Sequence, residues 1–431
     1  MSDSLGRRNF IAQLAATGVA AGMVPSFDVP RRLLGDEPFV VGPQDDDARV
    51  FAAARKRFLF PTSVTYCNTG TLGAIPRDVM DVYVKGLQQL EQELPDWPYY
   101  QADGEPLTGY QPHTEFRAEA GAFINAPAEE IAFTQNATMG MSFIANGLEL
   151  AAGDEVLSTN QEHTGGIGGW RLRAKRHGIV VKELPLADAL PKGPDGVVAL
   201  FADSITPKTR VIMFSHITSS RGILMPAREL CAVARSRGIV SVVDGAQAIG
   251  QMRVDVKALG CDAYVASPHK WLLAPKGTGI LYIKRDVQPR IWNTLASAGF
   301  DDEAAGAFRY MHYGTGSPAL VWGLSAAIKF ISTIGIDRIE RWDGMLTKRL
   351  RDGLAKIPRA RVTSPNDPRL TAAITTFKVE GVTARDLQTA LWKRRVRVRP
   401  QNDERGVRLS AHIYMSPADV DTVLDVASRL A

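Results

Sequence analysis

Residues 239–270 read IVSVVDGAQAIGQMRVDVKALGCDAYVASPHK, and this segment carries the clearest indication of the fold. It contains two short apolar runs, Ile239–Val243 and Asp262–Ala266, separated by a longer stretch. Further runs of strand length alternate with amphipathic stretches of helix length at Ile131–Thr134, Glu155–Ser158, Val180–Leu184, Arg210–Ser215 and Gly279–Lys284. Seven strands with intervening helices predict an open α/β sheet.

Polar residues follow two of these strands, at the edge where open α/β sheets bind their ligands. Asp244 begins the turn Asp244-Gly245-Ala246-Gln247, and Lys270 ends the segment Ser267-Pro268-His269-Lys270. Alone, such an aspartate usually caps a helix or binds a metal, and such a lysine is usually solvated. Pyridoxal 5′-phosphate (PLP) chemistry needs both groups, a lysine amine for a Schiff base and an anion beside the pyridine nitrogen. The pair therefore predicts a PLP site.

Both motifs resemble the cofactor motifs of class V aminotransferases, a family that includes cysteine desulfurases, selenocysteine lyases and isopenicillin N epimerase. The resemblance runs from about Tyr66 to the C-terminus, in the family's order and spacing. It implies a PLP-dependent transferase of fold type I. Such a protein has a large domain with a seven-stranded, mostly parallel sheet and a smaller α+β C-terminal domain. The resemblance also implies a homodimer whose active site is shared between subunits.

The pattern along the chain predicts more than one domain, and the length allows two. The regular alternation ends near Asp286 and is followed by a long helix around Val321–Ile334 and a strand-like run at Ala373–Val379. We expect a twin-arginine signal segment at residues 1–30, an N-terminal segment that packs with the small domain at 31–65, a large PLP-binding domain at 66–295 and the small domain at 296–431.

The resemblance assigns the contacts around the cofactor ring residue by residue. It implies that Gln247 bonds the phenolic oxygen of PLP and that His163 stacks on the pyridine ring as a catalytic residue. It also implies that Ser267 and His269 bind the phosphate beside Lys270. Without the family context, these residues would be turn, capping or structural residues.

Two further segments are expected at the phosphate. Asn136-Ala137-Thr138 lies between the strand Ile131–Thr134 and a helix beginning near Met139, where backbone N–H groups and the helix dipole favour an anion. The triplet resembles the phosphate-binding turn of the family, although by itself it would be an ordinary helix N-cap. Thr315, in the pair Gly314-Thr315, matches the family's contact to the phosphate of the partner subunit.

The substrate contact is expected near the C-terminus. Arg408, in the run VRLSAHIY at residues 407–414, resembles the family's Arg-x-Ser segment, whose guanidinium grips the α-carboxylate of the substrate. A planar, permanently charged fork suits a carboxylate. The alternative is a structural strand arginine, in which case Arg309 or Arg399 becomes the candidate.

Composition excludes several classes of protein. The chain has 431 residues and a formal net charge of only +5, which argues against nucleic acid as the main partner. The cysteines Cys67, Cys231 and Cys261 fit neither a CxxC metal site nor a disulfide framework, and no metal site is expected. Desulfurases place a nucleophilic cysteine on a loop of the small domain, but no cysteine follows Cys261. Persulfide-forming chemistry is therefore not expected.

The first thirty residues have the pattern of a twin-arginine export signal. Arg7-Arg8 precedes a mild apolar run, Leu14–Met23, that Pro25 closes. This run is too short to span a membrane. We therefore expect a periplasmic or otherwise exported protein that is not in the membrane in its mature form. The alternative is an ordinary amphipathic N-terminal helix.

The function implied is that of a PLP enzyme that binds an amino acid as an external aldimine and forms a Cα carbanion, with Lys270 as the base. An isopenicillin N epimerase-like epimerase or a C–S or β-lyase ranks above an aminotransferase. A rival from another class is a non-catalytic module that binds PLP or an amino acid. A nicotinamide-dependent oxidoreductase is disfavoured because Gly165–Gly169 lacks the GxGxxG spacing.

Overall fold

The computed structural model describes residues 39–42, 44–93 and 112–431, and its largest sheet has seven strands in the order β2-β8-β7-β6-β5-β3-β4. The strands are β2 (Ile131–Thr134), β3 (Glu155–Thr159), β4 (Val180–Leu184), β5 (Thr209–Ser215), β6 (Val240–Asp244), β7 (Ala263–Ala266) and β8 (Gly279–Ile283). β8 runs antiparallel to both of its neighbours, and the other paired strands are parallel. The predicted α/β fold with a seven-stranded, mostly parallel sheet is confirmed.

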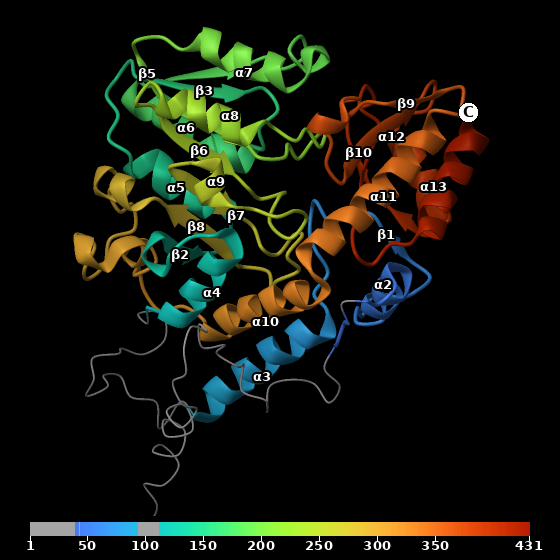
Figure 1. The fold of residues 1–431 in the computed structure, drawn as a ribbon, viewed down its shortest axis with the longest axis horizontal. Coiled ribbons are helices and arrows are strands. Elements are labelled where there is room, and N and C mark those ends of the chain that lie inside the picture. Colours follow the sequence, from blue (N-terminus) through green and yellow to red (C-terminus); the bar gives the residue numbers. More distant parts are fainter. Residues whose placement is uncertain (1–38, 43, 94–111) are drawn as a thin grey trace, which may run out of the picture.

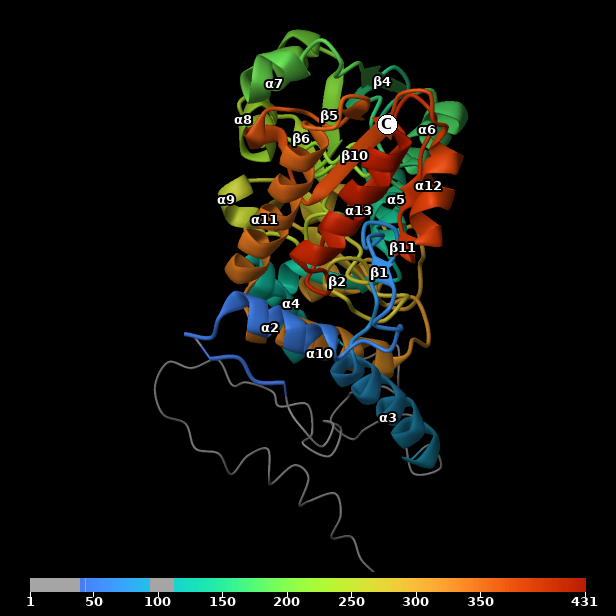
Figure 2. The ribbon, with the colours of Figure 1, turned by 90° about the vertical axis from the view of Figure 1, so that its right-hand side faces the viewer.

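Helices cover both faces of this sheet, as expected for strands that are buried on both sides. The helices are α5 (Ala137–Gly147), α6 (Thr164–His177), α7 (Gly193–Ser204), α8 (Ala227–Arg235) and α9 (Val256–Leu259). In Figure 2 the last three lie to one side of the strands and the first two to the other. The sheet is therefore the middle layer of three.

Two element boundaries differ from the sequence prediction in ways that matter for the site. Helix α5 begins at Ala137 rather than near Met139, because the Asn136 side chain caps it by accepting the Met139 N–H at 2.9 Å. Strand β6 includes Asp244, because the ladder continues to Ser215 on one side and Val265 on the other. The predicted aspartate is thus held by sheet pairing.

A second sheet lies apart from the first, at the right of Figure 1. It has four strands in the order β12 (Arg399–Pro400), β13 (Val407–Ser410), β10 (Ile374–Val379) and β9 (Ala360–Val362), all paired antiparallel. The helices α11 (Ile336–Leu354), α12 (Ala384–Lys393) and α13 (Pro417–Leu430) accompany it. The predicted strand at Ala373–Val379 is confirmed as β10, one residue shorter.

The N-terminal part of the described chain packs on C-terminal elements. Helix α2 (Asp47–Arg55) contributes Phe51, which stacks on Trp342 of α11 with ring centroids 4.5 Å apart. The short strand β1 (Thr65–Tyr66) pairs in parallel with β11 (Val396–Arg397). The domain boundaries themselves stay a prediction, and residues 1–30 lie outside the described residues.

Three helices occupy the lower part of Figure 1: α3 (Arg77–Glu93), α4 (Thr114–Ile124) and α10 (Pro318–Ile334). The predicted helix around Val321–Ile334 is α10, which begins three residues earlier. No single helix of the described chain is long and apolar enough to cross a membrane. Helices α10 and α11 reach that length and hydropathy only when taken together, and the chain bends by 72° between them.

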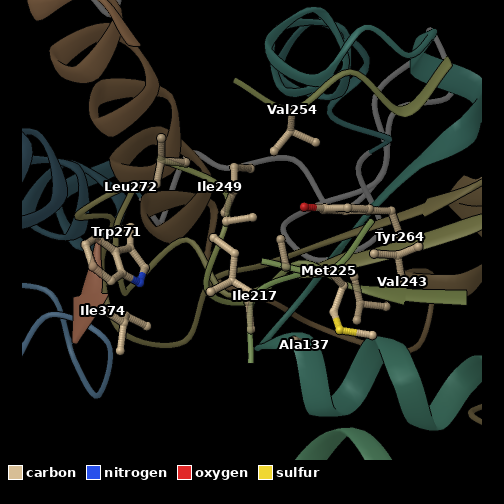
Figure 3. Packing of buried hydrophobic residues seen from close by; sticks show 14 of the residues in the cluster. Ala137, Ile217, Met225, Val243, Ile249, Val254, Tyr264, Trp271, Leu272 and Ile374 are labelled. Atoms are coloured by element: carbon tan, nitrogen blue, oxygen red, sulfur yellow. The ribbon is translucent and has the colours of Figure 1, made fainter. Parts of the chain in front are cut away.

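The remaining helical segments are short 3-10 turns: η3 (Ala128–Glu130), η4 (Leu190–Lys192), η5 (Arg285–Arg290), η6 (Glu303–Tyr310) and η7 (Pro368–Leu370). The hydrophobic core runs from the large sheet towards the small one. Figure 3 shows Val243 and Tyr264 of the large sheet in the same cluster as Trp271 and as Ile374 of the small sheet. The two sheets therefore share one continuous hydrophobic core.

Candidate active site

A cavity of about 270 Å³ lies at the carboxyl ends of the central strands of the large sheet. It brings together nine of the residues predicted from the sequence, namely Asn136, Ala137, Thr138, His163, Asp244, Gln247, Ser267, His269 and Lys270. Gly70, Thr71, Gly166, Ser215, Ser219 and Arg399 also line it. Arg408 and Thr315 are not among the residues that line this cavity.

Asp244 is a buried carboxylate with one oxygen held by the protein. Oδ1 accepts the Ala246 N–H at 3.0 Å, and the side chain is 6% exposed. A Cβ atom at Gly166 of α6 would lie only 2.8 Å from Oδ2. The absence of a side chain at Gly166 therefore leaves Oδ2 accessible from the cavity, where a ring nitrogen could meet it.

Lys270 stands directly after β7 and its turn, with its backbone N–H bonded to Ser267 O at 3.0 Å. Burial lowers the pKa of its amine to about 8, although the nearby Asp244 carboxylate acts in the opposite direction. About a tenth of the amine is therefore uncharged at pH 7, and the uncharged amine is the form that attacks a carbonyl carbon. Gly73 packs so closely on the carbonyl of Lys270 that any side chain there would clash with it.

The Gln247 amide is held in one orientation. Its Oε1 accepts the Trp271 indole N–H at 2.8 Å, and its Nε2 donates to Gly70 O at 2.8 Å. Because an indole nitrogen can only donate and a carbonyl can only accept, the amide cannot be flipped. The second N–H of Nε2 remains for an acceptor such as a phenolic oxygen.

His163 is the N-cap of α6, and its Nδ1 accepts the Gly165 N–H at 3.1 Å. Burial and the nearby Lys270 amine lower the pKa of this imidazole. Since Nδ1 is the acceptor, the neutral ring carries its proton on Nε2. A neutral imidazole suits stacking against a ring, the role that the resemblance implies.

Glu162 was not predicted as a site residue and does not itself line the cavity, but it precedes His163 and bonds Ser215, and both of these residues line the cavity. Burial raises the pKa of its carboxyl to about 7. Its oxygens are bonded to the Ser215 and Thr159 hydroxyls at 2.5 Å each. In the sequence, only the position of Glu162 directly before the predicted site residue His163 could have indicated it.

The N-terminus of α5 forms the end of the cavity predicted to bind phosphate. Ala137 N–H donates to Ser267 Oγ at 3.0 Å, which joins the two predicted phosphate segments. His269 Nδ1 lies 3.0 Å from Thr278 O, and because a carbonyl only accepts, Nδ1 carries a proton. Nε2 of His269 is thereby left for the cavity, where it can donate to an anion only when the ring is protonated on both nitrogens. The helix N-terminus and the adjacent Ser267 hydroxyl suit an anion without that condition.

Arg408 of β13 lies behind the cavity wall and is 1% exposed. Its guanidinium donates to Ser219 O at 2.7 Å, to Thr71 Oγ1 at 2.6 Å and to Asn68 Oδ1 at 3.2 Å. Its Nε has no partner in the described chain. Burial, with Arg399 nearby, lowers the pKa of this guanidinium to about 9.

The two alternative arginines behave differently from each other. Arg399 of β12 is the direct cross-strand partner of Arg408, lines the cavity and is exposed. Arg309 is buried elsewhere and donates to Ile291 O and to the Tyr310 hydroxyl. Arg309 is not among the residues that line the Lys270 cavity, whereas Arg399 is, so the geometry favours Arg399 as the alternative.

Thr315 lines a separate cavity of about 160 Å³ together with Tyr313 and Gly314. Thr278, whose carbonyl bonds His269, lines the same cavity. Within one chain Thr315 does not reach the Lys270 cavity. Its contribution to a neighbouring subunit stays a prediction.

The donor set of the Lys270 cavity fits PLP. A lysine amine, an open carboxylate oxygen, an oriented amide N–H and a helix N-terminus converge on one space. These groups match the aldehyde, ring nitrogen, phenolic oxygen and phosphate of the cofactor, respectively.

Comparisons with known proteins agree with this arrangement. The family model for aminotransferase class V matches residues 108–423. The isopenicillin N epimerase of Amycolatopsis lactamdurans is 30% identical over 410 residues, which cover 89% of this chain and 99% of that protein. A probable cysteine desulfurase of Xylella fastidiosa (strain 9a5c) is 33% identical over 287 residues, covering 64% of this chain and 67% of that protein.

Among solved structures, the cystine C–S lyase C-DES in complex with cysteine persulfide superposes with a TM-score of 0.75 at 25% identity. The superposition covers 85% of this chain and 97% of that one.

Proposed function

Because this chain belongs to the class V aminotransferase family, we propose that it acts at the Cα–H bond of an amino acid, either as an isopenicillin N epimerase-like epimerase or as a C–S or β-lyase. At the coarser level it is a PLP-dependent enzyme of fold type I. The finer proposal rests on the cavity and on the relatives together.

The observation that carries the proposal is that the Lys270 amine and the Asp244 carboxylate open into one cavity. When bound, PLP supplies the electron sink for cleavage at Cα. Asp244 Oδ2 would keep the ring nitrogen protonated, and Gln247 Nε2 would donate to the phenolic oxygen. The Lys270 amine, with its pKa lowered to about 8, is suited to take the α-proton. An epimerase must then deliver a proton to the opposite face of Cα, whereas a lyase releases the β-substituent instead.

One feature favours an epimerase-like activity, and another disfavours desulfurase chemistry. The epimerase relative matches over 99% of its own length, which leaves no large part of that protein without a counterpart here. No cysteine follows Cys261, so the C-terminal region has no thiol for persulfide chemistry. The cysteines in the described chain are all buried.

For the substrate carboxylate we propose Arg408, with Arg399 next to it at the cavity. The side chain that grips a carboxylate should be anchored, and Arg408 is anchored by three acceptors. Thr71 lines the cavity and already holds one Arg408 nitrogen, so a carboxylate entering there can replace the hydroxyl as acceptor.

The experiment that tests the proposal is incubation of the holoenzyme with a panel of L-amino acids in D2O, followed by NMR and chiral chromatography. An epimerase would give deuterium at Cα and the opposite enantiomer. A lyase would give a keto acid, ammonia and the released β-substituent. Stoichiometric transfer of the amino group to the cofactor, with neither inversion nor β-elimination for any substrate, would contradict the proposal and indicate an aminotransferase.

We propose further that the enzyme is a homodimer with Thr315 at the phosphate of the neighbouring subunit. Mixed dimers of a Lys270→Ala chain and a Thr315→Ala chain test this, because one of the two hybrid sites would carry neither defect. Recovery of activity is expected. Verified heterodimers without recovery would place Thr315 outside the partner's site.

We also propose export by the twin-arginine route, on the pattern of Arg7-Arg8 and the mild apolar run after it. Replacing both arginines by lysine should retain the protein in the cytoplasm. Unchanged export of that variant would overturn this proposal.

A further inference from the structure

A buried acid–imidazole pair lies behind the cofactor lysine, outside the cavity already described. Asp343 of α11 is 1% exposed and His412 is 0% exposed. His412 Nδ1 lies 2.9 Å from Asp343 Oδ2, and His412 Nε2 lies 2.9 Å from the backbone carbonyl of Trp271. Asp343 Oδ1 has no hydrogen-bond partner in the described chain.

The partners determine where the protons are. The Trp271 carbonyl can only accept, so His412 Nε2 carries a proton and donates it. One further proton lies between Nδ1 and Oδ2, whichever atom owns it. The pair is therefore neutral overall in either form, and the Nε2–H bond to Trp271 persists in both.

This donor acts on the segment that carries the lysine. Trp271 immediately follows Lys270, and its indole N–H fixes Oε1 of Gln247. The His412 and Trp271 rings meet edge to face with centroids 5.1 Å apart. Figure 3 shows the Trp271 indole within the core cluster, next to Leu272 and Ile374. One residue, Trp271, thus connects the pair to Lys270 through its backbone and to Gln247 through its indole N–H.

Packing alone does not explain such a pair. A buried acid–imidazole pair costs desolvation, and apolar residues of similar volume often stabilise a core as well or better. The unpartnered Oδ1 adds to that cost. What the pair provides that apolar residues cannot is a directed donor on the Trp271 carbonyl.

We propose that His412, oriented by Asp343, is a positioning residue that fixes the Lys270–Trp271 segment, and through the Trp271 indole the Gln247 amide, against the cofactor. The pair links α11 and the segment after β13 to the chemistry at the carboxyl edge of the large sheet. This inference rests on PLP being held at Lys270.

The test uses a matched pair of substitutions. His412→Gln places an amide N–H near the position of Nε2, so it keeps the donor to the Trp271 carbonyl. His412→Asn places its amide near Nδ1, so it keeps the contact with Asp343 and loses that donor. Each variant is made as the full-length holoenzyme, and two properties are measured: the visible absorption band of the lysine-bound cofactor and the rate at which the apoprotein takes up PLP.

We expect His412→Gln to retain the wild-type band and uptake rate within about twofold, and His412→Asn to shift the band and slow uptake about tenfold, the scale of one lost buried hydrogen bond. Equal behaviour of the two variants would overturn the proposal.

If neither folds, Asp343→Asn and Asp343→Leu replace them. The asparagine can donate to Nδ1 and should keep the band, whereas the leucine releases the ring and should shift it; equal bands would again overturn the proposal. Failure of the wild-type protein to form any band would instead contradict PLP binding itself.

Discussion

The two sheets present their functional side chains in opposite ways. On the large sheet, Asp244 and Lys270 stand at strand ends, and each keeps its reactive atom free for the cavity. On the small sheet, Arg408 stands inside the inner strand β13, with its guanidinium held by Ser219, Thr71 and Asn68. The residues proposed to hold the cofactor are therefore already in place. Arg408, by contrast, must give up hydrogen bonds to the protein before it can bind a substrate carboxylate.

The largest expected effect concerns the lysine of the large sheet. Lys270→Ala should lower kcat/KM by roughly 10³-fold or more, because it removes both the covalent anchor of PLP and the base at Cα. Steady-state kinetics on reconstituted protein measure this. Turnover within tenfold of wild type would mean that another base does the work.

Asp244→Asn should follow, with a loss of about 10²- to 10³-fold in kcat, because the amide no longer supplies the negative charge beside the ring nitrogen. Binding of PLP should persist, since the phosphate contacts are at the other end of the cavity. An Asn variant with unchanged kcat and a wild-type cofactor spectrum would contradict the role given to this carboxylate.

Arg408→Ala tests the small sheet. Loss of a charge-assisted, bidentate contact costs roughly 2–5 kcal/mol, so kcat/KM should fall by about two to three orders of magnitude while the cofactor band stays intact. Arg408→Lys should recover part of this loss. Arg399→Ala is the matched control and should cost less, and a larger loss for Arg399→Ala would make Arg399 the carboxylate contact.

The pH dependence of cofactor uptake tests whether the Lys270 amine is already prepared for reaction before PLP binds. The pKa of Lys270 is lowered to about 8, so below that pH the neutral amine, and with it the uptake rate, should rise about tenfold per pH unit and then level off above it. Because Asp244 raises this pKa, Asp244→Asn should move the midpoint to lower pH. Stopped-flow absorbance measures both, and a midpoint near 10 would show an unperturbed lysine.

The smallest effect concerns Gly166, whose missing side chain keeps Asp244 accessible. Gly166→Ala would bring a methyl group 2.8 Å from Asp244 Oδ2. It should weaken PLP binding about tenfold, which is the effect of losing one hydrogen bond to that oxygen. Gly168→Ala in the same helix meets nothing within 4 Å and should leave PLP binding unchanged. Equal affinities for PLP in the two variants, measured by titration, would contradict this account.

The same contrast explains what the sequence could predict. Strand-end residues such as Asp244 and Lys270 follow apolar runs directly, so the seven strands and the cofactor side of the cavity were predictable to within a residue or two. The contacts of Arg408 could not be predicted, because Asn68 and Ser219 come from segments 340 and 189 residues away along the chain.

Other site residues were missed for related reasons. Glu162 becomes a site carboxyl only through the Ser215 and Thr159 hydroxyls, which belong to two different strands. Asp343 reaches the site through His412 and Trp271, and nothing in its own helix marks it. Packing between distant segments, rather than local pattern, places these groups.

The central claim is that Lys270 holds PLP covalently, and reduction of the purified holoenzyme with borohydride tests it most directly. We expect a yellow protein whose visible band is lost on reduction, with a stable pyridoxyl adduct found by peptide mass spectrometry on Lys270. A protein that stays colourless after PLP is added, or an adduct on a different lysine, would contradict it.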